Sequence, residues 1–157
     1  AAVATDAVAA RWRAKFGLAT TQADDAILMQ DFLSLLALGR HDFTLCFRHL
    51  PRPARLRDLI VNQVALEAWL QRYSVRLGHE SLSQHTRTAA MDAVNPLYVP
   101  RNHLLELAIR ATEAGDAVPL RRLMQALAHP FSEQPDADNL AALPPQWAAG
   151  LSLSCSS

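Results

Sequence analysis

Hydrophobic residues along this chain recur mostly at spacings of three and four, the period of one face of an α-helix. The first such stripe consists of Val8, Trp12 and Phe16, and it is followed by Gly17, a residue that can end a helix. Residues 23–38 are good helix formers and apolar nearly all round. This second pattern predicts a central helix, because a helix without a polar face is usually buried.

Caps and prolines divide the next stretch. Asp42 is a candidate N-cap for a short helix over residues 43–47, which the prolines of the 51–53 segment must end. Hydrophobic positions over residues 56–77 then mark one face of a predicted long helix. Residues 81–91 have weaker periodicity, so helix and loop are both compatible with their sequence.

The second half of the chain begins with two X-Pro steps, Asn95-Pro96 and Val99-Pro100, each of which disfavours helix at the residue before the proline. A helix is predicted over residues 101–114, and Gly115-Asp116 turns the chain back into a second one. Four residues of this second helix fit the i, i+3, i+4, i+7 template: Leu120, Leu123, Met124 and Leu127. The pattern predicts a helical hairpin.

Composition changes after Pro130, where three further prolines interrupt a stretch with few consecutive apolar residues. We expect an extended tail over residues 130–157, packed at Phe131 and Trp147 if anywhere. The whole pattern predicts an all-α fold, in which residues 1–157 form a single helical domain of about six or seven helices.

The chain has 157 residues, of which 50% are hydrophobic and 19% charged, with a formal net charge of zero. No overall field therefore favours nucleic acid or an anionic membrane, and no apolar run reaches the ~20 residues of a membrane span. We expect neither kind of partner. Two cysteines do not form a disulfide scaffold, which indicates a reducing compartment. Since the chain begins at Ala1 without a methionine, we expect a fragment with a native C-terminus.

Motifs for independent catalysis are missing from the sequence. The five glycines are not close enough to one another for a phosphate-binding loop, and neither the catalytic-loop nor the Asp-Phe-Gly motif of kinases is present. No pair of the six histidines has the i, i+4 spacing of metal ligands, and Cys46 with His49 lacks a third ligand. The sequence predicts no catalytic, cofactor-binding or metal-binding residues within this fragment.

Two features remain as candidate sites. Arg48, Arg52, Arg55 and Arg57 cluster around two prolines and form either a patch for phosphate or an acidic partner, or a solvated helix start paired with carboxylates such as Asp58.

The two cysteines differ in their surroundings. Cys46 stands between Leu45 and Phe47 and is predicted to be a small buried hydrophobe. Cys155 lies between serines near the C-terminus, where the residues alone fit an incidental thiol and a redox group equally well.

Several segments together resemble one family. Upstream these are Asp24-Asp25, Asp42-Phe-Thr44 and Phe47-Arg-His-Leu50. Downstream they are Met91-Asp-Ala-Val-Asn-Pro-Leu-Tyr-Val-Pro-Arg-Asn102, Ala108-Ile109, Glu113-Ala-Gly-Asp116, Pro130-Phe-Ser-Glu-Gln-Pro135 and Cys155-Ser-Ser157. Their order and spacing are similar to the C-terminal part of the selenoprotein O (YdiU-type) family of kinase-like protein adenylyltransferases, in its cysteine form.

The resemblance implies a parent protein that transfers AMP from ATP to hydroxyl side chains of proteins. ATP and magnesium or manganese would bind a kinase-like core that precedes this region, so the partners implied are that core and the parent's protein substrates. Cys155 stands where some members have selenocysteine, which implies a redox-regulatory role, with a cysteine of the core as disulfide partner. The alternative is a helical interaction module that recruits substrates without catalysis. We expect a bacterial cytoplasmic protein, or a mitochondrial one if the source is eukaryotic.

Overall fold

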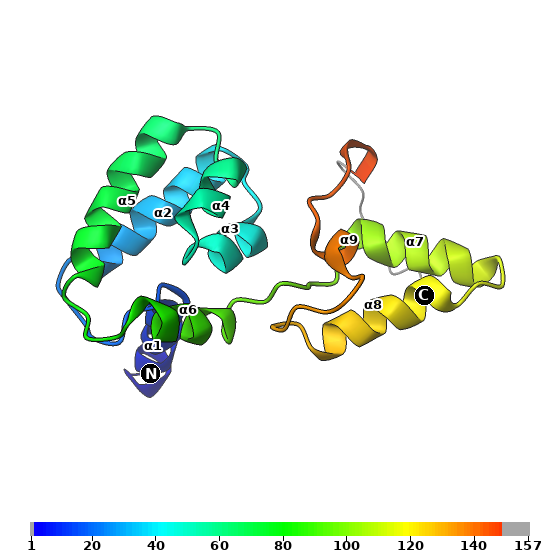
Figure 1. Cartoon of the computed structure of the whole chain (residues 1–157), viewed down its shortest axis with the longest axis horizontal. Helices are drawn as coiled ribbons and strands as arrows, with labels where there is room; N and C mark the ends of the chain where they lie inside the picture. The colour runs from blue at the N-terminus through cyan, green and yellow to red at the C-terminus, as the bar shows by residue number, and fades with distance from the viewer. Residues whose placement is uncertain (1, 149–157) are drawn as a thin grey trace. The chain divides into compact units, whose positions relative to one another are not determined.

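The computed structural model describes residues 2–148, with side chains described from Asp6 onward. Over this range the chain forms nine α-helices and one 3₁₀-helix and contains no strand, which confirms the all-α prediction (Figure 1). Its contacts group into two compact units, Ala1–Asn95 and Pro96–Ser157, and each has its own hydrophobic core. That residues 1–157 act as one domain stays a prediction.

Six helices make up the first unit, in which α2 lies beside α5, α3 beside α4, and α1 against α6 (Figure 1). Their bounds are α1 Ala2–Lys15, α2 Asp25–Leu38, α3 Phe43–His49, α4 Pro53–Leu59, α5 Gln63–Leu77 and α6 Gln84–Asp92.

Aromatic rings fill the core of the first unit. Phe16 at the end of the predicted first stripe is fully buried and packs edge-to-face on Phe47, with ring centroids 5.2 Å apart. Phe32 of the predicted central helix lies 4.5 Å from Trp69, and Trp69 stacks on Tyr73 at 4.8 Å. Such pairs contribute about 0.5–1.5 kcal/mol each beyond the area they bury. They join α2, α3 and α5 to the end of α1.

The predicted long helix over residues 56–77 is wrong, because it is two helices. Ile60 has extended backbone angles (φ −105°, ψ 124°) and ends α4, and the Asn62 side chain then accepts a hydrogen bond from the Ala65 N–H at 3.1 Å to cap α5. Ile60 stays 2% exposed although it is outside the helix. The hydrophobic pattern therefore continued across the break and concealed it.

Other local predictions are confirmed. Gly17 ends α1 with a φ of +66°, and the Leu18 N–H bonds the Arg13 carbonyl at 2.9 Å, as in a Schellman motif. The Asp42 carboxylate accepts from the Leu45 N–H at 2.8 Å and so caps α3. Residues 81–91, left open between helix and loop, contain most of α6, which Ser83 caps.

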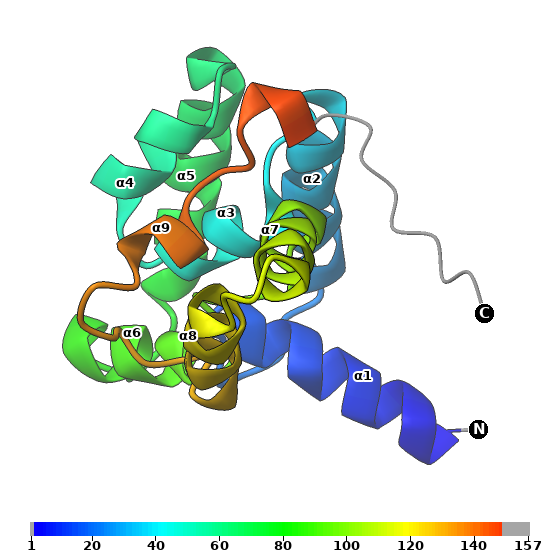
Figure 2. The ribbon, with the colours of Figure 1, turned by 90° about the vertical axis from the view of Figure 1, so that its right-hand side faces the viewer.

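The second unit contains the predicted helical hairpin, formed by α7 (Asn102–Glu113) and α8 (Val118–Ala128), which Figure 2 shows side by side. A one-turn helix, α9 (Asp138–Ala141), and a 3₁₀-helix (Gln146–Ala148) follow. Together with the split of residues 56–77, these raise the helix count above the predicted six or seven. No helix of residues 2–148 has both the length and the apolar character needed to cross a membrane.

The predicted anchors of the tail are wrong within its described part. Phe131 is 41% exposed and Trp147 is 54% exposed, although the Trp147 ring lies edge-on to His103 at 6.2 Å. Smaller residues do the packing, since Ala137 and Leu140 are buried in the core of the second unit. The remainder of the predicted tail, including Cys155, lies outside the described residues.

Candidate functional site

Arg48 and Arg52, two of the four arginines of the predicted patch, both form an ion pair with the Asp92 carboxylate, Arg48 at 3.5 Å. Arg48 is only 4% exposed, and its Nη1 donates to the backbone carbonyls of Asp92 (3.0 Å) and Asn95 (3.2 Å). Arg52 holds both carboxylate oxygens of Asp92, at 2.9 and 2.5 Å. This two-point geometry is the strongest arrangement available to an arginine and a carboxylate.

Residues 92–95 are also hydrogen-bonded to α1. Asn95 is fully buried, donates from Nδ2 to the Lys15 carbonyl at 3.0 Å and accepts from the Lys15 Nζ at 3.2 Å. Burial lowers the pKa of Lys15. Residues 92–95 belong to the segment 91–102 that resembles a known family, and this part of it is fastened to α1 and α3.

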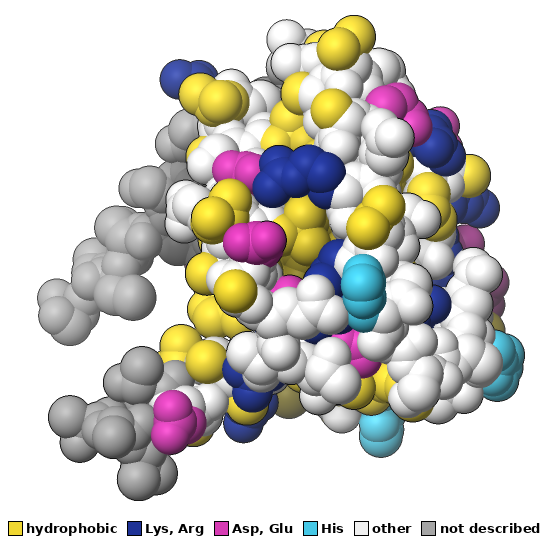
Figure 3. All heavy atoms as spheres, turned by 90° about the vertical axis from the view of Figure 1, so that its left-hand side faces the viewer, with side chains coloured by type: hydrophobic (Ala, Val, Ile, Leu, Met, Phe, Trp, Pro, Cys, Tyr) yellow, Lys and Arg dark blue, Asp and Glu magenta, His cyan; other side chains and the backbone are white. Residues whose placement is uncertain are grey.

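The structure does not gather the four arginines into one cationic surface. Arg57 lies farther along and pairs with Glu67 across α4 and α5, at 2.5 and 3.0 Å, while Arg55 is exposed. The carboxylates involved are Asp92 and Glu67, whereas the proposed partner Asp58 is exposed. On the face drawn in Figure 3, charged side chains of both signs alternate with hydrophobic ones. Substrate recruitment through these arginines stays a prediction.

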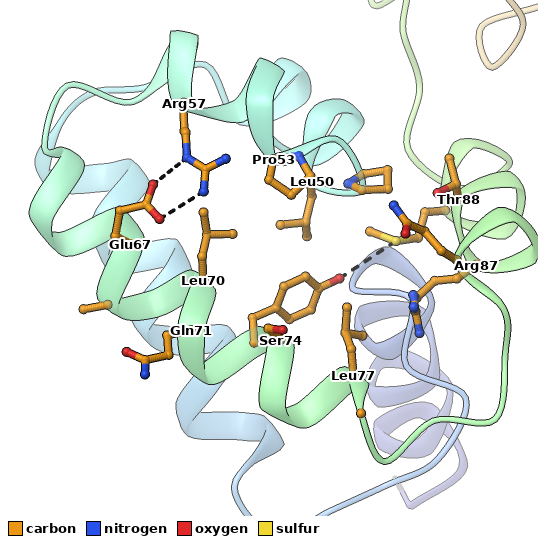
Figure 4. A pocket seen from close by; sticks show the side chains of 16 residues that line it. Leu50, Pro53, Arg57, Glu67, Leu70, Gln71, Ser74, Leu77, Arg87 and Thr88 are labelled. Carbon is orange, nitrogen blue, oxygen red and sulfur yellow. Dashed lines mark hydrogen bonds and ion pairs between the residues drawn. The ribbon is translucent and has the colours of Figure 1, made fainter.

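A cavity of about 780 Å³ opens between α4, α5 and α6. In Figure 4 the Arg57 and Glu67 pair lies at one end of it, and Arg87 and Thr88 of α6 lie at the other. Its wall also includes Tyr73, whose hydroxyl donates to the Phe16 carbonyl at 2.7 Å. Burial raises the pKa of Tyr73, so this phenol stays protonated. The size suits a small organic ligand.

A second buried charge cluster organises the opposite end of α5. Arg76 is 6% exposed and pairs with Asp25 at 2.5 Å and with Glu80 at 2.7 Å. Glu80 also accepts from the Thr20 hydroxyl (2.7 Å) and from the N–H groups of Thr20 (3.2 Å) and Ala19 (3.1 Å). The cluster fixes the loop between α1 and α2 and has a structural role.

Burial alone would raise the pKa of Glu80, but the hydrogen bonds from Thr20, Arg76 and Ala19 outweigh it and lower the pKa to about 2. For Asp25, burial likewise acts upward, and the hydrogen bonds from Arg76 and the Gln22 N–H give a net lowering of its pKa. Both carboxylates are therefore charged at neutral pH.

Cys46 is fully buried, as predicted, and desolvation together with the nearby charge of Asp42 raises its thiol pKa to about 12. Such a thiol is a poor nucleophile and a poor metal ligand at neutral pH. Burial and then the neighbouring arginines Arg52, Arg55 and Arg48 lower the pKa of His49. Within residues 2–148 no group of three or more His, Cys, Asp or Glu side chains is placed to hold a metal ion.

Sequence comparison identifies relatives along nearly the whole chain. It is 46% identical to the protein nucleotidyltransferase YdiU of Bordetella avium over 98% of this chain and 32% of that protein. The YdiU proteins of Bordetella petrii and Burkholderia multivorans are 48% and 46% identical, over 94% and 92% of the chain. No family model matches the sequence.

Fold and sequence together define an all-α region of a nucleotidyltransferase-family protein. The chain belongs to the YdiU family, in agreement with its motifs, and corresponds to the family's C-terminal region. It spans about a third of the length of the relatives it matches.

Proposed function

We propose that this chain is the C-terminal helical region of a longer protein adenylyltransferase, which transfers AMP from ATP to Ser, Thr or Tyr hydroxyls of proteins. The observation that supports it is the 46–48% identity to YdiU nucleotidyltransferases over nearly the whole chain. The sequence has no glycine cradle for phosphates, so we assign ATP and its magnesium or manganese ions to the part of the protein outside this chain.

The role we assign to the chain itself is to support the kinase-like core. The hydrogen bonds of residues 92–95 favour this role: Asp92 and Asn95 are bound by Arg48, Arg52 and Lys15. Buried charged groups with satisfied hydrogen bonds resist deformation, which suits a buttress more than a mobile lid. Since the relatives are bacterial, we place the protein in the bacterial cytoplasm as part of this proposal.

Labelling with AMP tests the division of labour. The full-length protein, incubated with α-³²P-ATP and Mg²⁺ or Mn²⁺, is expected to label protein substrates, whereas residues 1–157 alone neither bind nor turn over ATP. Isothermal titration of the isolated chain with ATP provides the binding measurement. Turnover of ATP by the isolated chain, or no labelling by the full-length protein, would contradict the proposal.

We further propose that Cys155 is a redox-regulatory residue whose disulfide partner is a cysteine of the core. Burial of Cys46 and its raised pKa disfavour that thiol as the partner. With oxidised glutathione, one thiolate forms a mixed disulfide and releases glutathione, and the second thiolate then displaces the remaining glutathione. Two protein thiols are thereby oxidised and one glutathione disulfide is reduced.

Mass mapping of the non-reduced full-length protein tests this pairing. A disulfide between Cys155 and the core is expected, and Cys155→Ser should abolish both the disulfide and the response of AMP labelling to oxidised glutathione. Cys46→Ser is the matched control and should leave both unchanged. A Cys46 to Cys155 disulfide would overturn the assignment.

A further inference from the structure

Arg87 differs from Arg57, the other arginine that lines the cavity between α4, α5 and α6. Among the described residues its side chain makes no ion pair or hydrogen bond, and the Nη1 atom is buried without a partner. Arg57 on the same wall is instead paired with Glu67. A buried donor that has no acceptor is unfavourable, so a ligand that brings a negatively charged acceptor to this side chain would remove that cost.

The stem of Arg87 is held in place. It packs on Gly17, where an added Cβ would lie only 2.8 Å from the Arg87 Cγ and 2.6 Å from the Met91 Sδ. Because Gly17 also has a positive φ, both the backbone angle and the close approach require glycine there. The aliphatic part of the Arg87 side chain therefore has a defined position, and the side chain loses less conformational entropy when a ligand binds its guanidinium.

The remainder of the cavity wall sets the kind of anion that fits. Arg57, Glu67 and Arg87 line the cavity and together give it a charge of +1, from two positive groups and one negative group. Leucine side chains provide apolar surface, and hydroxyls are available from Ser74 and Thr88 (Figure 4). A single negative charge on an apolar body matches this wall better than a dianion, which Glu67 would repel.

We propose that this cavity binds an organic carboxylate, with the Arg87 guanidinium as the ion-pair partner and the leucine-lined wall holding the apolar part. This proposal does not depend on the nucleotidyl transfer proposed above. The carboxylate comes either from a free organic acid or from an Asp or Glu side chain of a protein segment.

Titration of the ¹⁵N-labelled chain with sodium butyrate, at constant ionic strength, tests the site by amide chemical shifts. Saturable shifts are expected in residues 71–74 and 84–88, and n-butanol, which lacks the charge, should not reproduce them. Arg87→Met should weaken butyrate binding about tenfold, which corresponds to loss of the ion pair. Arg55→Met, at an exposed arginine of the same unit, is the matched control and should bind as the parent chain does.

Ser74→Glu provides a second variant if Arg87→Met does not fold. It places a carboxylate on the exposed side of α5 at the cavity wall, where it should compete for Arg87 and abolish butyrate binding while the circular dichroism spectrum is unchanged. Shifts that fail to saturate, or that persist in both variants, would overturn the proposal.

The source of the carboxylate is distinguished by a capped Leu-Glu-Leu tripeptide. Tighter binding of this peptide than of butyrate assigns the site to a protein side chain, and tighter binding of butyrate assigns it to a free acid. Inorganic phosphate at neutral pH is the competing probe. If phosphate binds in the same cavity as tightly as butyrate, the assignment to a carboxylate is wrong.

Discussion

Arg76 and Arg48 are nearly as buried as the leucines around them, and each is accommodated by a different set of acceptors. Arg76 faces two carboxylates, from Asp25 and Glu80, whereas Arg48 bonds mainly to backbone carbonyls of residues 92–95. Removing one member of such a set costs more than the interaction contributes, because the remaining charge is left buried. Single substitutions in these clusters therefore give the clearest tests at the residue scale.

Glu80 should make the stability of the chain depend on acid pH. Its pKa is about 2 in the folded chain and 4.5 as an unperturbed group, so its stabilising effect is complete above pH 4.5 and is lost as the pH falls toward 2. Glu80→Gln should lower the free energy of unfolding by about 1–3 kcal/mol at pH 7. This difference should shrink toward pH 2, as measured by urea denaturation at several pH values.

The matched control is Asp58→Asn, which removes an exposed carboxylate of the same unit and should change stability little at any pH. If Glu80→Gln shows the same pH dependence of unfolding as the parent chain, Glu80 is not the titrating group.

The sequence predicted the roles of residues that depend on near neighbours in the chain, but not the contacts between residues far apart in the chain. Asp42 and Cys46 were predicted correctly because capping and local hydrophobicity depend on neighbours within a few positions. The pairing of Arg52 with Asp92 joins residues 40 positions apart and exists only once the segment between α3 and α4 packs against the end of α6. The one sequence signal for Asp92 was its place in the segment 91–102.

At the scale of elements, the break between α4 and α5 shows what hydrophobic periodicity leaves undetermined. Ile60 is buried although its backbone is extended. The apolar spacing therefore runs through the break and was compatible with one helix. The residue that marks the start of the second helix is Asn62, whose side chain accepts a hydrogen bond from the Ala65 N–H. Asn is poor in helix interiors and favoured at N-caps, which is the signal that the periodicity concealed.

Asn62→Ala should therefore destabilise the first unit by about 1 kcal/mol, the usual cost of losing an N-cap side chain. Asn62→Asp keeps an acceptor at the cap and should retain the stability of the parent chain. Thermal unfolding followed by circular dichroism at 222 nm compares the three proteins. Equal stability of the alanine and aspartate variants would show that the cap contributes nothing.

At the scale of the whole molecule, length and composition predicted enough apolar surface for a core but not its division in two. The boundary between the units falls at Asn95-Pro96, one of the two X-Pro steps at which the sequence disfavours helix. Asn95 is completely buried in the first unit, and Tyr98 is the first residue of the core of the second. Which residues join which core depends on packing that no local pattern encodes.

The core of the second unit can be tested at two adjacent positions of α8. Leu123 is 3% exposed and Met124 is 63% exposed, so the same truncation to alanine removes either buried or solvated side-chain volume. Leu123→Ala should cost about 2–5 kcal/mol, because it leaves a cavity beneath the helical hairpin, whereas Met124→Ala should cost less than about 0.5 kcal/mol.

Hydrogen exchange of the α7 and α8 amides measures both losses within this unit. Faster exchange in the Leu123 variant alone is the expected result, since the hairpin is stabilised by burial against Ala137 and Leu140 and not by helix propensity. Equal exchange in the two variants would mean that this core does not stabilise the hairpin.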